Sequence, residues 1–191
     1  MASVDQPYVS RAGVKLEAAL RAFALPVEGL ICCDFGSHVG GFVDCLLRHG
    51  AARVHSVDTG YGVLAYRLRK DPRVVAHERR NAIHFVAPEP CDLITMDVGW
   101  TRLRLVLPAA RRCLKRGAAG VVALVKPQYE APAEWLHGGV LVAEKRANVL
   151  AACRDDVESL AWRVAGEIES PIRGQGGNAE WLWHLRDTAA P

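Results

Sequence analysis

Two apolar runs of the sequence end on a charged residue, and these two residues are the first candidates for chemistry. The segment GVVALVKPQYE starts at Gly120, reads as a buried strand, and stops at Lys126 with Pro127 directly after it. The segment ITMDVGW places Asp97 beyond a similar apolar run. If both runs are neighbouring parallel strands, the ammonium and the carboxylate meet at the carboxyl edge of the sheet, where such sheets bind ligands. The pair could handle a proton on a bound substrate, or it could be only a structural ion pair.

A third polar cluster, DFGSHVGGF, lies between the first apolar run and the next helical pattern. Gly36, Gly40 and Gly41 would allow a ligand to approach the backbone closely. Their G-x-x-x-G-G spacing differs from the G-x-G-x-x-G of dinucleotide binders. Asp34 would repel a diphosphate but suits an ammonium or sulfonium group, and Asp58, after the next apolar run, can accept hydrogen bonds from a ribose. These residues favour S-adenosylmethionine over NAD as the ligand.

The elements that must position these residues alternate along the chain. Apolar runs predict strands at 29–36, 53–60, 73–80, 91–99, 120–127, 163–170 and 179–187, and helical periodicity predicts helices at 10–24, 41–50, 62–71, 101–117 and 143–162. Continuous apolar strands alternating with helices are typical of a parallel sheet covered on both faces. The last two strands have only a glycine-rich turn between them, so one of them enters antiparallel. We expect an α/β, Rossmann-like class I methyltransferase fold with seven strands, in a single domain over residues 1–191.

The composition narrows the class of protein. Half of the 191 residues are hydrophobic, 24% are charged and the net charge is +3, which permits a polyanionic partner without requiring one. The six cysteines form no C-x-x-C and have no histidine at metal-ligand spacing, so we expect no metal site. No signal peptide or membrane-spanning run is present, which predicts a cytoplasmic protein without membrane contact. The arginine clusters between residues 67 and 116 are either solvated surface or phosphate contacts.

Several segments, in order over nearly the whole chain, resemble the TlyA-like branch of the FtsJ family, which are ribosomal RNA 2′-O-methyltransferases that use S-adenosylmethionine. They include YVSRAGVKLEAAL, DFGSHVGGF, ERRN, ALVKPQYEA and SPIRGQGGNAEWLWHL. The family's Lys-Asp-Lys-Glu tetrad falls by position on Lys15, Asp97, Lys126 and Glu180. On their own, Lys15 and Glu180 would be interpreted as surface residues, and the resemblance makes them catalytic candidates.

The resemblance also implies binding residues. The cofactor S-adenosylmethionine would leave as S-adenosyl-L-homocysteine. To the acids and glycines above, the resemblance adds these cofactor-binding residues: Ser37, His38, Phe42, Thr59, Asn81 and Asp97. For the acceptor we expect contributions from Trp100, Arg102 and Tyr129, because exposed RNA bases are usually held by aromatic stacking. Lys126 is then either the general base for a ribose hydroxyl or a group that orients it and stabilises the oxyanion.

The sequence also departs from the family. Family members carry an S4-type RNA-binding domain before the segment that matches SRAGVKL, and Gly99-Trp100-Thr101-Arg102 replaces a Ser-Phe-containing stretch. We therefore expect RNA, in the form of ribosomal RNA or a ribosomal subunit, as the partner, with another protein supplying the RNA-binding function. One alternative is a methyltransferase acting on a small molecule or another nucleic acid, because a shared core does not fix the substrate. The other is a non-catalytic S-adenosylmethionine-binding module.

Overall fold

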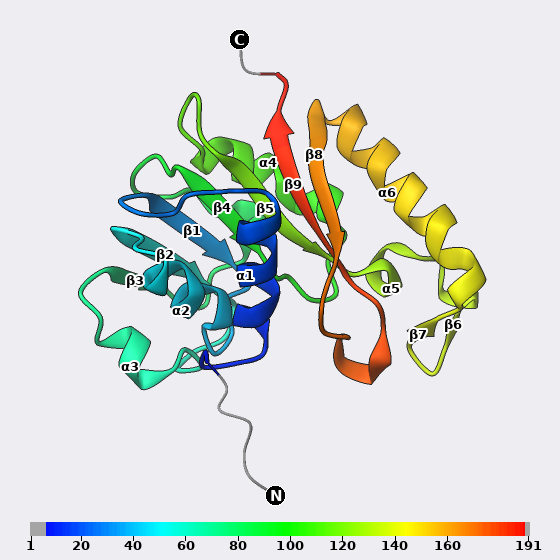
Figure 1. The fold of residues 1–191 in the computed structure, drawn as a ribbon, viewed down its shortest axis with the longest axis horizontal. Helices are drawn as coiled ribbons and strands as arrows, with labels where there is room; N and C mark the ends of the chain where they lie inside the picture. Colours follow the sequence, from blue (N-terminus) through cyan, green and yellow to red (C-terminus); the bar gives the residue numbers. More distant parts are fainter. Residues whose placement is uncertain (1–6, 190–191) are drawn as a thin grey trace, which may run out of the picture.

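The computed structural model describes residues 7–189, which form one seven-stranded sheet in the order β3-β2-β1-β4-β5-β9-β8 (Figure 1). Strands β1 to β5 pair in parallel, and β9 is antiparallel to both of its neighbours, β5 and β8. The predicted sheet with one reversed strand near the C-terminus is confirmed. The strands are β1 (Ile31–Phe35), β2 (Arg53–Val57), β3 (Val74–His77), β4 (Leu93–Met96), β5 (Gly120–Val125), β8 (Trp162–Glu169) and β9 (Trp181–Asp187).

Helices cover both faces of this sheet, as predicted, and each face has its own apolar core. One core packs the first three helices, including Leu16, Phe42 and Leu68, against the sheet. The other packs the fourth and sixth helices, including Val106 and Val157, against the opposite face. The helices are α1 (Ala12–Ala22), α2 (Gly41–Arg48), α3 (Tyr66–Arg69), α4 (Leu103–Cys113), α5 (Pro127–Glu130) and α6 (Arg146–Ser159), with 3₁₀ turns at Ala82–His84, Ala133–Trp135, Ala143–Lys145 and Gln175–Gly177. No helix in the described part of the chain is long and apolar enough to cross a membrane.

Two details differ from the sequence-based expectation. The helix predicted over 62–71 is wrong for most of its length, because the backbone N–H of Gly62 is held by Glu78 and only α3 is helical. A short hairpin, β6 (Leu136–His137) with β7 (Val140–Leu141), was not predicted. Its turn consists of Gly138 and Gly139, both with positive φ, the conformation that two-residue hairpin turns require.

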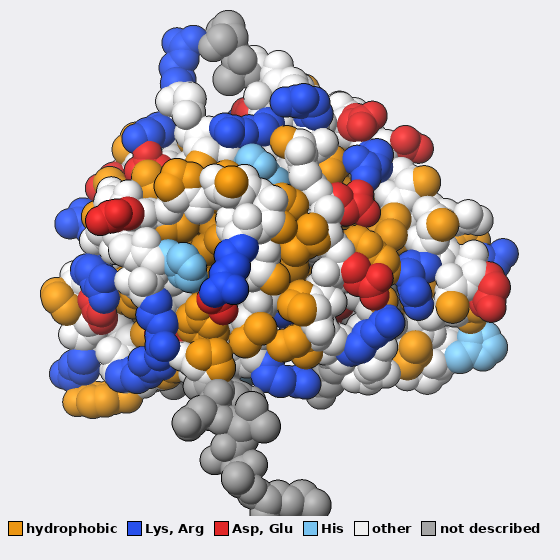
Figure 2. Space-filling model, viewed as in Figure 1, with side chains coloured by type: hydrophobic (Ala, Val, Ile, Leu, Met, Phe, Trp, Pro, Cys, Tyr) orange, Lys and Arg blue, Asp and Glu red, His pale blue; other side chains and the backbone are white. Residues whose placement is uncertain are grey.

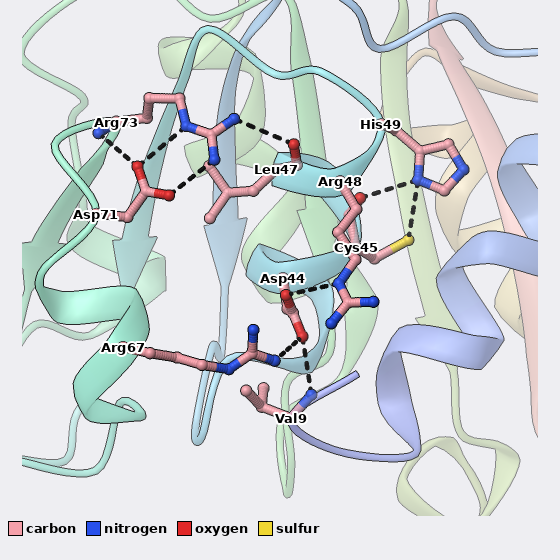
Figure 3. A network of polar contacts seen from close by, with 9 residues as sticks. All are labelled: Val9, Asp44, Cys45, Leu47, Arg48, His49, Arg67, Asp71 and Arg73. Atoms are coloured by element: carbon pink, nitrogen blue, oxygen red, sulfur yellow. Dashed lines mark hydrogen bonds and ion pairs between the residues drawn. The ribbon is translucent and has the colours of Figure 1, made fainter. Parts of the chain in front are cut away.

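The segment that leads into α1 is fixed by a buried carboxylate on α2 (Figure 3). Asp44 accepts hydrogen bonds from the backbone N–H of Val9 at 2.9 Å and from Arg48 and Arg67 at 3.1 and 2.6 Å. A Cβ added at Gly41 would lie 2.2 Å from the Ser10 hydroxyl oxygen, so α2 and the start of α1 are in direct contact. These contacts determine where α1 lies beside the carboxyl edge of the sheet.

Candidate active site

A cavity of about 680 Å³ opens at the carboxyl edge of the parallel strands. Its wall combines the ends of β1, β2, β4 and β5 with the start of α1 and the residue before β9. Lys15, Asp97, Lys126 and Glu180 all line it. The structure therefore brings the four predicted catalytic residues to one place, and their catalytic role stays a prediction.

The four residues form two ion pairs. Lys126 Nζ lies 2.5 Å from Asp97 Oδ1 and donates to the carbonyl of Val98 at 3.3 Å. Lys15 Nζ pairs with Glu180 Oε2, and these side chains are only 11% and 3% exposed. The first pair forms because β4 and β5 are neighbours that end at the same edge. The expectation that Asp97 and Lys126 converge there is confirmed.

The position of Glu180 depends on the reversal of β9. Because β9 runs antiparallel to β5, its first residue Trp181 lies opposite Val125, and Glu180 reaches the edge where Lys126 ends β5. A Cβ added at Gly174 would lie 2.2 Å from Glu180 Oε1, so the preceding turn needs glycine there.

The same turn is tied to the β6–β7 hairpin by Asn178. Its side-chain amide donates to the carbonyl of Gly139 and accepts from the N–H of Leu141, both at 3.0 Å. These two hydrogen bonds fasten the segment directly before Glu180 to the hairpin.

The segment KPQYE holds the loop that carries Asp97. Pro127 opens the short helix α5, where its missing N–H costs nothing. Glu130 Oε1 accepts the backbone N–H of Leu103 at 2.7 Å and so closes the start of α4. Burial raises the pKa of Glu130, and the hydrogen bond from Leu103 partly opposes that rise. Lys126 at the start of the loop and Glu130 at its end therefore hold residues 97–102 from both sides.

Of the three predicted acceptor residues, two line the cavity. The rings of Trp100 and Tyr129 lie 4.9 Å apart between centroids, and Trp100 is 88% exposed. Trp100 also has a φ of 58°, an uncommon conformation for a bulky residue, which the surrounding loop must maintain. Arg102 lies outside the cavity wall, at the residue before α4.

The predicted cofactor residues divide into two groups. Gly36, His38, Asp58, Thr59 and Asn81 line the cavity together with Asp97. The carboxylate of Asp58 accepts the backbone N–H of His38 at 2.8 Å and that of Gly60 at 2.7 Å. Each carboxylate oxygen has a second lone pair, so both oxygens remain able to accept from a ligand hydroxyl.

The second group, Ser37, Gly40, Gly41, Phe42 and Asp34, lies outside the cavity wall. Phe42 is buried in the core, and Ser37 donates to the carbonyl of Asp34. A Cβ added at Gly40 would lie 2.4 Å from Leu68, and one at Gly41 would lie against Ser10. At both positions the space beside the backbone is filled by a protein side chain and is not open to a ligand. Glycine is therefore required at these two positions by packing within the protein.

Gly36 requires glycine for a different reason. Its φ is +83°, and an added Cβ would lie 2.6 Å from the carbonyl oxygen of Asp97. Glycine there lets the loops after β1 and β4 touch, which helps to set the position of Asp97.

Asp34 is fully buried behind the glycine loop. The Thr95 hydroxyl donates to its Oδ1 at 2.6 Å, while Oδ2 has no hydrogen-bond partner among the described residues. Burial raises the pKa of Asp34 to about 7, partly opposed by the hydrogen bond from Thr95. Asp34 was expected to contact a cationic ligand, but its carboxylate does not line the cavity.

Five polar residues line the cavity that the sequence reasoning did not select: Ser10, Arg11, Arg80, Thr101 and Gln128. Each lies within a segment that also contains selected residues. Their position in those segments was the only sequence signal for these residues, and it does not show which side chains point into the cavity. No group of three or more potential metal ligands gathers within residues 7–189.

The fold and the cavity define a class I methyltransferase. The model of the FtsJ-like methyltransferases matches residues 8–187, and the chain belongs to this family. It is 41% identical over 188 residues to the 16S/23S rRNA (cytidine-2′-O)-methyltransferase TlyA of Mycobacterium tuberculosis, covering 95% of this chain and 69% of that protein. It is 31% identical to the 23S rRNA (cytidine-2′-O)-methyltransferase TlyA of Campylobacter jejuni, covering 95% and 72%. A hemolysin-like structure from Streptococcus thermophilus superposes with a TM-score of 0.92 at 38% identity, covering 100% of this chain and 70% of that one.

Proposed function

We propose that this chain transfers the methyl group of S-adenosylmethionine to a ribose 2′-hydroxyl of RNA, with ribosomal RNA as the first candidate. The observation that carries the proposal is the assembly of two Lys–carboxylate pairs in one cavity, beside Asp58 and the loop after β1. The two relatives named above as rRNA (cytidine-2′-O)-methyltransferases support the substrate class.

The residues around Asp58 fit the cofactor. S-adenosylmethionine supplies a methyl group on a positively charged sulfur, open to in-line attack by an oxygen. Asp58 would accept from the ribose hydroxyls, while Gly36 and Asn81 would line its nucleoside portion. The cavity volume of about 680 Å³ lies within the usual range for cofactor sites.

The tetrad would act on the acceptor hydroxyl, which must lose its proton as the new oxygen–carbon bond forms. Lys126 donates to Asp97 and to the Val98 carbonyl, so its ammonium is held where it can orient the 2′-oxygen and stabilise negative charge on it. To act as the general base, Lys126 must first give a proton to Asp97 or to solvent, and its free amine then takes the hydroxyl proton. In the orienting role the hydroxyl proton passes to solvent and the rate falls once the ammonium loses its proton, whereas in the general-base role the rate rises as the amine is freed. A pH profile of single-turnover methyl transfer therefore separates the two roles.

Uncompensated positive charge at the cavity supports a phosphate-rich acceptor. Arg11 and Arg80 line the cavity, and neither has an ion-pair partner among residues 7–189. On the face shown in Figure 2, Lys and Arg side chains are spread among Asp and Glu and do not gather in one patch. We expect Arg11 and Arg80 to contact the phosphodiester backbone at the cavity. A partner protein that adds RNA-binding surface remains part of the proposal.

The test is transfer of labelled methyl from S-adenosylmethionine to ribosomal subunits and to naked ribosomal RNA. We expect label in RNA that makes one linkage resistant to alkali, and its loss in Lys126→Ala. The matched control is Lys145→Ala, at an exposed lysine outside the cavity wall, which should keep full transfer. No label in either RNA preparation, with the cofactor still bound, would refute the RNA acceptor.

A further inference from the structure

Gln128 carries a polar group that the described residues leave without a partner. The residue is only 8% exposed, and it lines the same cavity as Lys126 and Glu180. Its buried Oε1 accepts no hydrogen bond from any described residue. A buried amide carbonyl without a partner lowers the stability of the folded state, whereas an apolar side chain of the same shape would not.

The location of this carbonyl separates it from the other buried unpartnered atoms in the described part of the chain. Those are Asp34 Oδ2, Trp162 Nε1 and Trp183 Nε1, and none of these residues lines the cavity. Buried polar groups are normally hydrogen-bonded, so an unpaired one in the wall of a cavity points to a partner that enters with the ligand.

The fold assigns Gln128 to the acceptor side of the cavity. The cofactor candidates Asp58 and Asn81 follow β2 and β3, at one end of the sheet order. Gln128 follows β5, two residues after Lys126 and next to Tyr129, whose ring packs on Trp100. Strands β1 and β4 lie between the two groups.

We propose that Gln128 reads the hydrogen-bonding edge of the base in the acceptor nucleotide, an inference that rests on the proposed RNA 2′-O-methyltransferase function. An amide presents one acceptor and one donor side by side, which complements a base edge with an N–H next to a ring lone pair. Rotation about the last side-chain bond, which is soft in glutamine, turns Oε1 from its buried position toward the cavity. The amide orientation that the surrounding wall then favours decides which base edge is matched.

The experiment uses the RNA that the wild-type chain methylates, prepared with each of the four bases at the labelled nucleotide. The variants are Gln128→Met, which keeps the shape and removes both hydrogen-bonding groups, and Gln128→Glu, which keeps acceptors only. The matched control is Asn148→Met, at an exposed amide on α6. For each variant, kcat/KM is measured on the four RNAs, together with cofactor affinity by calorimetry and Tm.

For Gln128→Met we expect kcat/KM on the preferred base to fall roughly 10- to 100-fold, the range that a lost two-point base contact gives. The ratios between bases should move toward one, with cofactor affinity unchanged and Tm equal or higher. Gln128→Glu should favour bases that present an amine, and Asn148→Met should change no ratio.

Two outcomes would overturn the inference alone. Retention of the wild-type base preference in Gln128→Met would mean that the amide does not read the base. An equal loss on all four RNAs, with lower Tm or weaker cofactor binding, would mean that Gln128 is structural. A wild-type chain that methylates no RNA would instead refute the proposed function, and this inference with it.

Discussion

Replacement of Lys15 by methionine tests whether the buried ion pair of the tetrad is energetically coupled. Glu180 is 3% exposed and Lys15 is its ion-pair partner, so Lys15→Met leaves a carboxylate buried without a cation. Loss of one partner of a buried pair costs about 3–5 kcal/mol of unfolding free energy. In a chain of this length that corresponds to a Tm lower by about 6–20 °C.

The assay is a double-mutant cycle by urea denaturation at pH 7, with Glu180→Gln as the second variant. We expect the double variant Lys15→Met/Glu180→Gln to recover most of the loss, because it no longer buries an unpaired charge. The matched control is Glu17→Gln on the same helix, which breaks an exposed pair with Arg21 whose side chains are 24% and 76% exposed. That change should cost no more than about 1 kcal/mol.

Two results would contradict this reasoning. One is a Lys15→Met variant that loses no more stability than Glu17→Gln. The other is a double variant whose loss equals the sum of the two single losses, which would show that Lys15 and Glu180 act independently. Under the proposed function, methyl transfer should fail in both single variants and in the double variant, so stability and activity separate in the double variant.

Three further changes test the rest of the site. Because burial raises the pKa of Asp34 to about 7 while the unfolded value is near 4, wild-type stability should fall as pH rises from about 4 to 7. Asp34→Asn should remove that pH dependence and raise the free energy of unfolding by up to about 4 kcal/mol at pH 8, measured by urea unfolding at pH 5 and 8. An equal change of unfolding free energy between the two pH values in wild type and variant would contradict this. Gly36→Ala should cost about 1–3 kcal/mol through its positive φ and lower activity by displacing Asp97, and an unchanged Tm would argue against the strain. Asp58→Asn should weaken cofactor binding roughly 10-fold or more by calorimetry, and equal affinity would exclude its role.

The sheet and one half of the tetrad could be predicted from local sequence. Continuous apolar runs separated by helical patterns determine a parallel sheet, and Asp97 and Lys126 directly follow two of those runs. Lys15 and Glu180 could not be found in this way, because they meet across 165 residues and neither ends an apolar run. Only the resemblance selected them.

Features that depend on tertiary packing escaped the sequence. Gly40 and Gly41 were expected to face a ligand, but Leu68 and Ser10 occupy the space where their side chains would stand. The unpaired carbonyl of Gln128 is a property of the assembled wall, which no local pattern records. The hairpin at Gly138 was missed because its strands are two residues long, too short for an alternation to be seen.

The strand order has a consequence for synthesis of the chain on the ribosome. Strand β8 is made before β9, yet within residues 7–189 its one neighbour in the sheet is β9, which lies between β8 and β5. Without β9, the parallel strands β1 to β5 would leave β5 at the edge of the sheet, and β8 would have no strand to pair with. Since Glu180 directly precedes β9, the four charged residues come together only once β9 has inserted between β5 and β8. The residues of the cofactor-side wall thus precede β9 in the chain, whereas the complete set of charged groups requires β9 in place.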